Sequence, residues 1–216
     1  MGSLELVYKI IYSHAKNGNE VHWHNEESPA LLKEVIGLLH GSGNALDIGC
    51  GTGVNSVFMA QCGFKVTAID FVPRALEFAR KRATGSGVRI DFIRSDVTEF
   101  NGREKFDLIL DCGCLHSFDD RKRLEYKKKI LELMSVRCQY VLLHAGKKNK
   151  SDFGLGPKPK TRAELEQFFM PQLSLIDFIP DSSDVPFHQY RFVKNQLVPT
   201  RGSHQDSETN RRTPFV

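Results

Sequence analysis

Three glycines at alternating positions form the densest chemical signal in the sequence. Gly49, Gly51 and Gly53 lie where an apolar run that predicts a buried strand, residues 45–48, passes into a predicted helix. Glycine permits positive φ and lets a ligand approach the backbone without striking a Cβ. The first N–H groups of the following helix are free to bind polar ligand atoms, and such a turn lies at the open mouth of a parallel sheet. The spacing predicts a nucleotide-like cofactor at this turn.

Two acidic residues bear on which kind of nucleotide-like cofactor this turn binds. Asp47 precedes the first glycine by two positions, where it could reach an ammonium group, and Asp70 ends the next predicted strand, where it could accept hydrogen bonds from both ribose hydroxyls. Val54 stands where the dinucleotide pattern G-x-G-x-x-G has its third glycine. The combination favours a nucleoside that carries an amino acid over a pyrophosphate. A nicotinamide-dependent oxidoreductase stays open as the alternative.

Two further residues are candidates for catalysis. His116 follows a predicted central strand, residues 106–110, and so lies at the ligand-bearing edge of the sheet. Because histidine titrates near neutrality, His116 is the candidate general base, although it could simply hydrogen-bond the loop. Asp111 could face the amino-acid end of the cofactor or an amine of the substrate, or be a buried structural carboxylate.

The cysteines predict neither a disulfide framework nor a metal site. The chain has five, an odd count, and Cys112 and Cys114 form a C-x-C pair without the second pair that a zinc site needs. Free thiols in a reducing compartment are the interpretation, and we expect no metal.

The elements that must position these residues alternate along the chain. Strands are expected at 45–48, 64–69, 88–93, 106–110, 139–144, 173–179 and 189–193, and helices at 4–15, 28–39, 54–61, 73–83, 121–134 and 161–169. Strand–helix alternation predicts an α/β fold with parallel strands and helices on both faces.

Length and composition predict one domain. The chain has 216 residues, 40% of them hydrophobic, and a net charge of +4 without a basic block. These values exclude a disordered chain and give no nucleic-acid footprint. We expect an N-terminal helix and lid segment (1–27), a catalytic domain (28–196) and a mobile polar tail (197–216). With no apolar run of spanning length and no signal-peptide pattern, a soluble cytoplasmic protein without membrane contact is expected.

Four motifs resemble those of class I S-adenosylmethionine (SAM)-dependent methyltransferases. They are residues 46–53, Asp70, 95–97 and 106–111, and the resemblance covers about residues 28–195. It implies a Rossmann-like, mostly parallel seven-stranded sheet whose last strand is antiparallel, SAM as cofactor and S-adenosylhomocysteine as product. It implies that the three glycines and Cys50 lie along the methionine and ribose, near Asp47, and that Asp70 holds the ribose. It also implies that Phe71 and Val97 lie against adenine and that Asp96 accepts a hydrogen bond from the adenine amino group.

A narrower resemblance points to the small-molecule branch that includes thiopurine and heterocyclic-toxin methyltransferases. It rests on Trp23 with His24, and on residues 111–117. Trp23, counted among the cofactor residues, could form a lid or anchor the first helix, and the loop 147–160 could close over substrate or be solvated. The implied function is methyl transfer to sulfur, nitrogen or oxygen of a small aromatic or heterocyclic acceptor, by a monomer or weak homodimer. An inactive SAM-binding partner subunit is the further alternative.

Overall fold

The computed structural model describes residues 3–21, 24–146, 158–184 and 186–195. Trp23, most of the predicted loop 147–160 and the predicted tail 197–216 lie outside the described residues. What was predicted for them stays a prediction.

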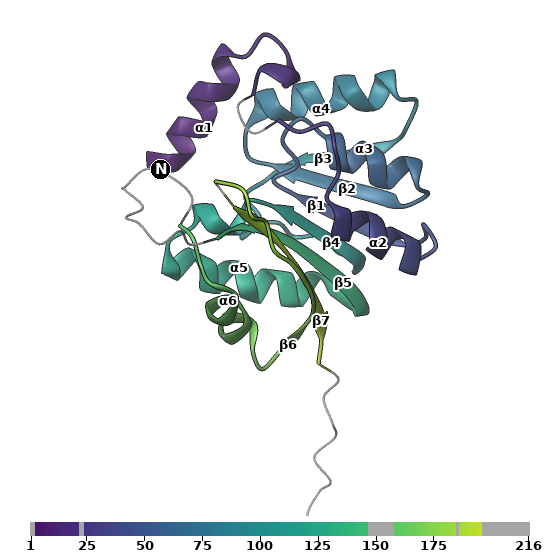
Figure 1. The fold of residues 1–216 in the computed structure, drawn as a ribbon. Helices are drawn as coiled ribbons and strands as arrows, with labels where there is room; N and C mark the ends of the chain where they lie inside the picture. The colour runs from purple at the N-terminus through teal and green to yellow at the C-terminus, as the bar shows by residue number, and fades with distance from the viewer. Residues whose placement is uncertain (1–2, 22–23, 147–157, 185, 196–216) are drawn as a thin grey trace, which may run out of the picture.

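A seven-stranded sheet forms the centre of the molecule (Figure 1). Its order is β3-β2-β1-β4-β5-β7-β6. The strands are β1 (Asn44–Ile48), β2 (Lys65–Asp70), β3 (Ile90–Arg94), β4 (Phe106–Cys112), β5 (Met134–Ala145), β6 (Leu173–Ile179) and β7 (Phe187–Lys194). The pairs from β3 to β5 are parallel, and β7 is antiparallel to both β5 and β6. The predicted Rossmann-like sheet with an antiparallel last strand is therefore confirmed.

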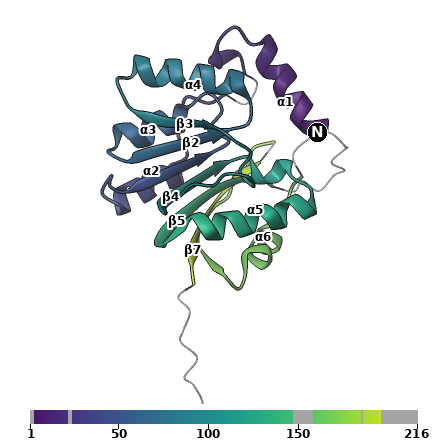
Figure 2. The ribbon, with the colours of Figure 1, turned by 180° about the vertical axis from the view of Figure 1, so that it is seen from behind.

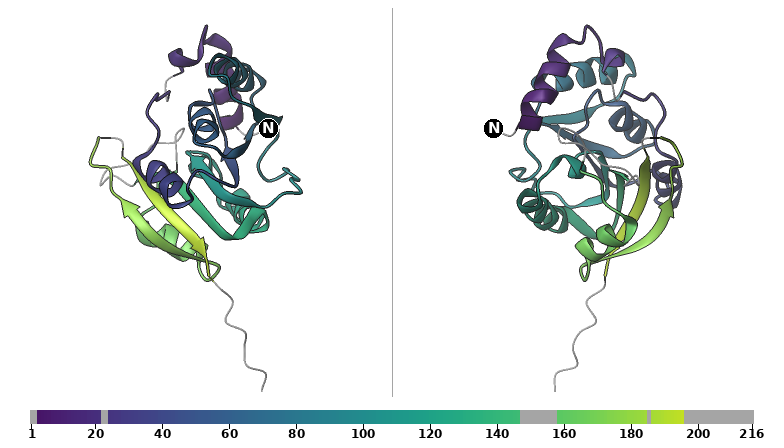
Figure 3. Two further views of the ribbon diagram at one scale, coloured as in Figure 1. Left: turned by 90° about the vertical axis from the view of Figure 1, so that its right-hand side faces the viewer. Right: turned by 60° about the vertical axis from the view of Figure 1, so that its left-hand side comes forward.

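Helices cover both faces of this sheet (Figures 2 and 3). On one side lie α2 (Ala30–Leu38), α3 (Val54–Gln61) and α4 (Pro73–Gly85); on the other lie α5 (Asp120–Leu133) and α6 (Arg162–Phe169). The apolar residues of α2 and α3 pack on Leu108, Leu110 and Val141, while those of α5 and α6 pack on Ile109, Tyr140 and Leu142. Neighbouring strand positions thus face opposite helical layers, as the period of two requires.

The first helix, α1 (Ser3–His14), stands apart from these layers and packs on α4. Two short 3-10 turns, η1 (Gly18–Glu20) and η2 (Leu115–Ser117), complete the described elements. Leu6, Val7 and Ile10 of α1 are exposed, whereas Tyr12 of the same helix is buried. Two tyrosines, Tyr8 and Tyr12, therefore supply much of the inner face of this helix.

The element boundaries lie within two residues of the sequence-based expectation, except at the start of β5. The helix α2 begins at Ala30 rather than at Ser28, and Ser28 does not cap it; the Gln189 side chain of β7 accepts the N–H of Leu31 at 2.9 Å. The strand β5 begins at Met134, five residues earlier than expected, because Met134 turns to extended backbone and pairs with Phe106 across a register shift. Within the described part of the chain, no helix combines the length and apolar character needed to cross a membrane.

Candidate cofactor and acceptor site

The glycine turn lies at the carboxyl end of β1, directly before α3. Gly51 has φ of 53°, and a Cβ there would lie 2.9 Å from the hydroxyl of Tyr12. Gly53 caps α3 in the left-handed conformation, and its Cβ would lie 2.8 Å from the Cβ of Ala79 on α4. Both positions require glycine, one because α1 crosses the turn and the other because α4 packs against it.

Asp70, at the end of β2, is joined directly to this turn. One carboxylate oxygen accepts the N–H of Gly51 at 2.9 Å and the other accepts the N–H of Val72 at 2.8 Å. The side chain is buried, and burial raises the pKa of this carboxyl to about 6 even though the backbone N–H groups oppose the shift. Each oxygen has a second lone pair, so the carboxylate can accept further hydrogen bonds.

Asp47, on β1, is a second buried carboxylate at the same edge. Its oxygen accepts a hydrogen bond from the Ser56 hydroxyl of α3 at 2.5 Å. Burial raises the pKa of Asp47 to about 7, with smaller contributions in the same direction from the charges of Asp70 and Asp111. The charges of the two other buried carboxylates, Asp70 and Asp111, thus make Asp47 harder to ionise.

The residues predicted to contact adenine lie beyond β2 and β3. Phe71 meets the ring of Tyr8 edge-on with centroids 6.2 Å apart, and Val97 is buried in the core. Asp96 accepts hydrogen bonds from the backbone N–H and the hydroxyl of Thr98. It also forms an ion pair with Lys122, whose Nζ lies 2.5 Å from Oδ2. Burial would raise the pKa of Asp96, but these partners outweigh it and hold that pKa below its usual range.

Asp111, at the end of β4, organises the loop that follows it. Its carboxylate accepts the N–H groups of Cys114 at 2.6 Å and Leu115 at 3.1 Å, and the hydroxyl of Tyr126 at 2.5 Å. Tyr126 in turn bonds the hydroxyl of Tyr140 at 2.8 Å. Burial raises the pKa of Asp111 to about 6 against these hydrogen bonds. This geometry fits the third expectation for Asp111, that of a buried structural carboxylate.

His116, in η2, folds back over the start of its own loop. A Cβ on Gly113 would lie 2.8 Å from its Cε1 atom. The ring is 5% exposed, meets His144 and Phe187 edge-on, and its Nδ1 has no hydrogen-bond partner. Burial lowers the pKa of His116 to about 3, so the imidazole is neutral at physiological pH and is a weak base.

The thiols nearest to the turn are not reactive thiolates. Burial raises the pKa of Cys50, Cys112 and Cys114 well above the usual range, and nearby carboxylates add to the shift. Cys114 packs beside the turn: a Cβ added to Gly49 would lie 3.4 Å from the Cβ of Cys114. The described residues contain no group of three or more side chains that could hold a metal ion.

Apart from His24, sequence reasoning missed the residues by which the N-terminal segment reaches the site. Tyr8 bonds Ser117 at 2.8 Å, His24 bonds Thr52 at 3.0 Å, and Arg82 of α4 pairs with Glu26 at 2.8 Å and 3.0 Å. The spacing of Tyr8 and Tyr12, four residues apart on one helix face, was the available signal. The segment therefore spans both ends of the predicted site.

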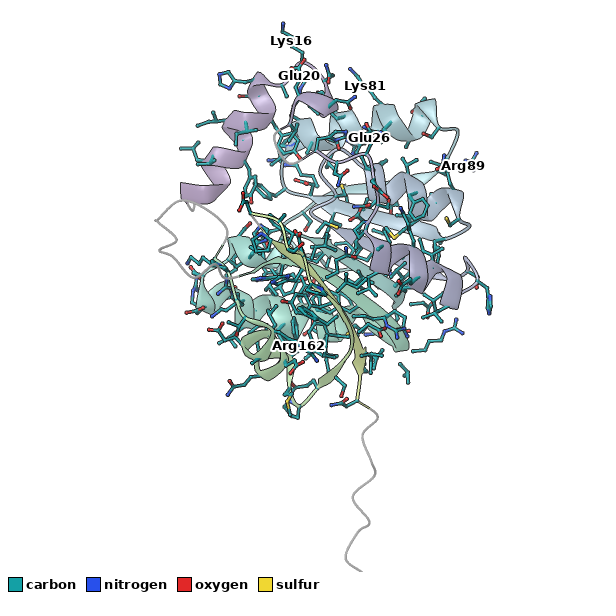
Figure 4. The ribbon with its side chains drawn as sticks, in the orientation of Figure 1. Lys16, Glu20, Glu26, Lys81, Arg89 and Arg162 are labelled. Carbon is teal, nitrogen blue, oxygen red and sulfur yellow. The ribbon has the colours of Figure 1, made fainter. Side chains whose placement is uncertain are left out.

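A separate cavity of about 340 Å³ opens between η1 and α4. It is lined by Lys16, Asn17, Gly18, Thr52, Phe78, Lys81 and Arg82. Figure 4 shows Lys16 and Lys81 at this end of the molecule, near the acidic side chains of Glu20 and Glu26. The cavity shares only Thr52 with the glycine turn and none of the predicted cofactor residues.

Comparison with known proteins agrees with this arrangement. Residues 45–135 match a family described as a methyltransferase domain. The chain is 26% identical over 158 residues to the 2-heptyl-1-hydroxyquinolin-4(1H)-one methyltransferase of Mycobacteroides abscessus, a match that covers 72% of this chain and 69% of the relative. It is 41% identical over 142 residues to a ubiquinone biosynthesis O-methyltransferase of Actinobacillus pleuropneumoniae, covering 58% and 59%.

Solved structures share the fold. The 1,6-didemethyltoxoflavin-N1-methyltransferase of Burkholderia thailandensis superposes with a TM-score of 0.69 at 19% identity, covering 91% of this chain and 92% of that one. The matched domain, the relatives and the strand order agree with one another. Residues 45–135 therefore match a methyltransferase domain, and the fold is the one shared by S-adenosylmethionine-dependent methyltransferases.

Proposed function

We propose that this enzyme binds SAM along the glycine turn and transfers its methyl group to a small aromatic or heterocyclic acceptor. The observation that carries the cofactor part is the cluster of Asp47, Asp70 and Asp111 at one sheet edge. None of the three has a cationic partner among the described residues. A buried group of carboxylates without a counter-charge favours a cationic ligand, and SAM brings a sulfonium and an ammonium group.

The cofactor residues follow from the positions that match the family pattern. Asp70 would hold the ribose hydroxyls, Phe71 and Val97 would flank adenine, and Asp96 would lie at the adenine amino group. Gly49, Cys50, Gly51 and Gly53 would line the methionine and ribose, with Asp47 below them. The crossing of Tyr12 over Gly51 adds α1 to this list as a cover for the cofactor.

The reaction needs orientation more than it needs a base. Bound SAM supplies an electrophilic methyl group with a good leaving group. The chain has to hold the acceptor in line and exclude water, and orientation of this kind can contribute roughly 7–11 kcal/mol of barrier reduction. The loop 113–117, fixed by Asp111 and Tyr126, lies beside the glycine turn through Cys114, which supports it as the acceptor-facing loop.

The two catalytic candidates take different roles in this proposal. Asp111 acts as a positioning residue, because its oxygens are occupied by the loop and by Tyr126. His116 remains in the acceptor site as a neutral ring rather than a strong base, since the pKa of about 3 disfavours its protonation. No observation favours the nicotinamide-dependent alternative.

The acceptor class rests on the named relatives. The Mycobacteroides relative acts, by its name, on a hydroxyquinolinone, and the Burkholderia structure holds 1,6-didemethyltoxoflavin. The buried ring of His116 and the half-buried ring of Phe187, which meet edge-on at the acceptor-facing loop, support a flat aromatic acceptor. The methylated atom is sulfur, nitrogen or oxygen, and we propose no nucleic-acid substrate.

The test is release of S-adenosylhomocysteine from SAM with a panel of thiols, phenols, hydroxyquinolinones and heterocyclic nitrogens. Turnover on an aromatic class, abolished by Asp70→Asn and kept by the exposed control Asp91→Asn, supports the proposal. Binding of SAM without turnover on any member would favour the inactive partner subunit. Failure of SAM to bind would remove the proposed cofactor site.

A further inference from the structure

A second histidine, His144, lies beside His116 at the carboxyl end of β5. Its side chain is fully buried, and the two imidazole rings meet edge-on with centroids 5.7 Å apart. Register places Leu142 of β5 beside Asp111 of β4, so His144 lies two residues beyond the buried carboxylate. The two histidines therefore share the sheet edge at which the acceptor-facing loop begins.

The hydrogen bond of His144 to its own strand fixes its tautomer. Nδ1 lies 2.9 Å from the carbonyl oxygen of Ala145. A carbonyl oxygen can only accept, so Nδ1 carries the hydrogen and the neutral ring presents a lone pair at Nε2. This Nε2 atom is buried and has no hydrogen-bond partner among the described residues. The protein thus holds a buried acceptor for which the chain itself supplies no donor.

His116 presents a second buried ring nitrogen without a partner, Nδ1. Its ring covers Gly113, and the neighbouring Cys114 packs beside Gly49 of the cofactor turn. Two orphaned nitrogens on adjacent rings are therefore continuous with the proposed methyl-donor site. Buried polar atoms are nearly always satisfied in folded proteins, so a pair of exceptions at one edge points to a ligand that completes them.

Burial, with a smaller effect of nearby positive charges, keeps His144 neutral by lowering its pKa. Burial lowers the pKa of His144 to about 4; the bond to Ala145 opposes this shift, and the nearby Arg123, Lys160 and His188 add to it. His116, the ring that faces it, has a pKa of about 3 for the same main reason. Both rings are neutral at physiological pH, and His144 then offers an acceptor and no free donor.

We infer that Nε2 of His144 accepts a hydrogen bond from an N–H or O–H group of the methyl acceptor and so selects acceptors that bring such a donor. The inference rests on the proposed function and names the chemistry by which that site recognises its substrate. A site built to bond a substrate hydroxyl rejects the analogue that lacks it, because the buried protein group is then left unpaired. Both rings are closed off from solvent, so an acceptor reaches them only when the covering residues separate.

The first measurement is the nitrogen spectrum of the histidine rings in ¹⁵N-histidine-labelled protein saturated with S-adenosylhomocysteine. The His144 signals are assigned by their loss in His144→Phe. The expected spectrum shows a neutral ring protonated at Nδ1 and bare at Nε2. A ring protonated at Nε2, or charged at neutral pH, would overturn the inference.

The second measurement adds phenol and anisole, which share a ring but differ in the donor. Phenol should move the Nε2 signal toward the hydrogen-bonded position and bind about tenfold more tightly than anisole, as one added hydrogen bond predicts. His144→Gln, which keeps an acceptor oxygen near this position, should retain the preference, and His144→Phe should lose it. Equal binding of the two probes to the wild-type protein would contradict the inference.

Two controls separate this inference from the proposed function. His40→Asn replaces an exposed histidine at positive φ with a residue that tolerates that conformation, and should leave both probes unaffected. SAM binding by calorimetry should be unchanged in all His144 variants. If the wild-type protein does not bind SAM, the proposed function is contradicted. If it binds SAM but does not prefer phenol over anisole, only the role of His144 is contradicted.

Discussion

The hydroxyl oxygens of Tyr8 and Ser117 lie 2.8 Å apart although 109 positions separate them in the chain. One belongs to α1 and the other to η2, directly after His116. Tyr12, one turn further along α1, lies against Gly51. The same helix therefore contacts the acceptor-facing loop and the cofactor turn, and its docking should respond to both ligands.

Tyr8→Phe should weaken S-adenosylhomocysteine binding by about two- to tenfold, because one net hydrogen bond that docks α1 is lost. Calorimetry measures this change, and Val7→Ala on the exposed side of the same helix is the matched control. A double-mutant cycle with Ser117→Ala should show coupling between the two side chains. Purely additive effects would mean that this contact does not hold α1 over the site.

Asp70→Asn should lower the affinity for SAM by about 10- to 100-fold, since charge-assisted hydrogen bonds to the ribose are lost. The control Asp91→Asn removes an exposed carboxylate of β3, the neighbouring strand, and should bind normally. Titration calorimetry on both variants gives the comparison. Equal affinities would remove Asp70 from the cofactor site.

Tyr126→Phe should lower the free energy of unfolding by about 1.5–3 kcal/mol, the usual contribution of a hydrogen bond to a charged group. The loss should be larger above pH 6 than below it, because burial raises the pKa of Asp111 to about 6 and only the ionised carboxylate loses a charge-assisted bond. Urea unfolding at pH 5 and pH 7.5 measures it. An identical loss at both pH values would separate Tyr126 from the charge of Asp111.

Asp47 should make the cofactor-free protein less stable as the pH rises. Its pKa is about 7 in the folded protein against 3.8 as the ordinary value, so the folded state holds a proton that the unfolded chain releases between these values. Stability from this group is complete below pH 3.8 and is lost as the pH rises through 7, by at most about 1.4 kcal/mol per pH unit.

The measurement is the difference in unfolding free energy between wild-type protein and Asp47→Asn at several pH values. The difference is needed because the buried histidines, with lowered pKa values, act in the opposite direction below pH 6.5. Binding of cationic SAM should favour the ionised carboxylates and release protons. A pH-independent difference would show that Asp47 is already ionised in the folded state.

Local patterns in the sequence were sufficient for the central elements. The glycine turn, the strand that ends at Asp70 and the segment 106–111 each combine a short apolar run with glycine or aspartate at its end, so their position could be predicted. The antiparallel last strand came from the family resemblance. The domain limits at residues 27 and 196 and the oligomeric state stay predictions.

Contacts between distant segments could not be predicted in the same way. Gln189, rather than Ser28, bonds the first turn of α2, and that pairing depends on where β7 inserts in the sheet. His144 looked like an ordinary strand residue, because its importance depends on the register of β4 with β5 and on the fold of η2. Tyr8 and Tyr12 could not be singled out because their contacts, with Ser117 and Gly51, lie far away in the sequence.

The most direct test of the account is a crystal structure of the protein with S-adenosylhomocysteine. The account predicts ribose hydroxyls bonded to Asp70, adenine between Phe71 and Val97, and the sulfur facing the loop that carries His116. A ligand bound instead in the cavity between Lys16, Phe78 and Arg82, with Asp70 still bonded only to the backbone of Gly51 and Val72, would contradict it.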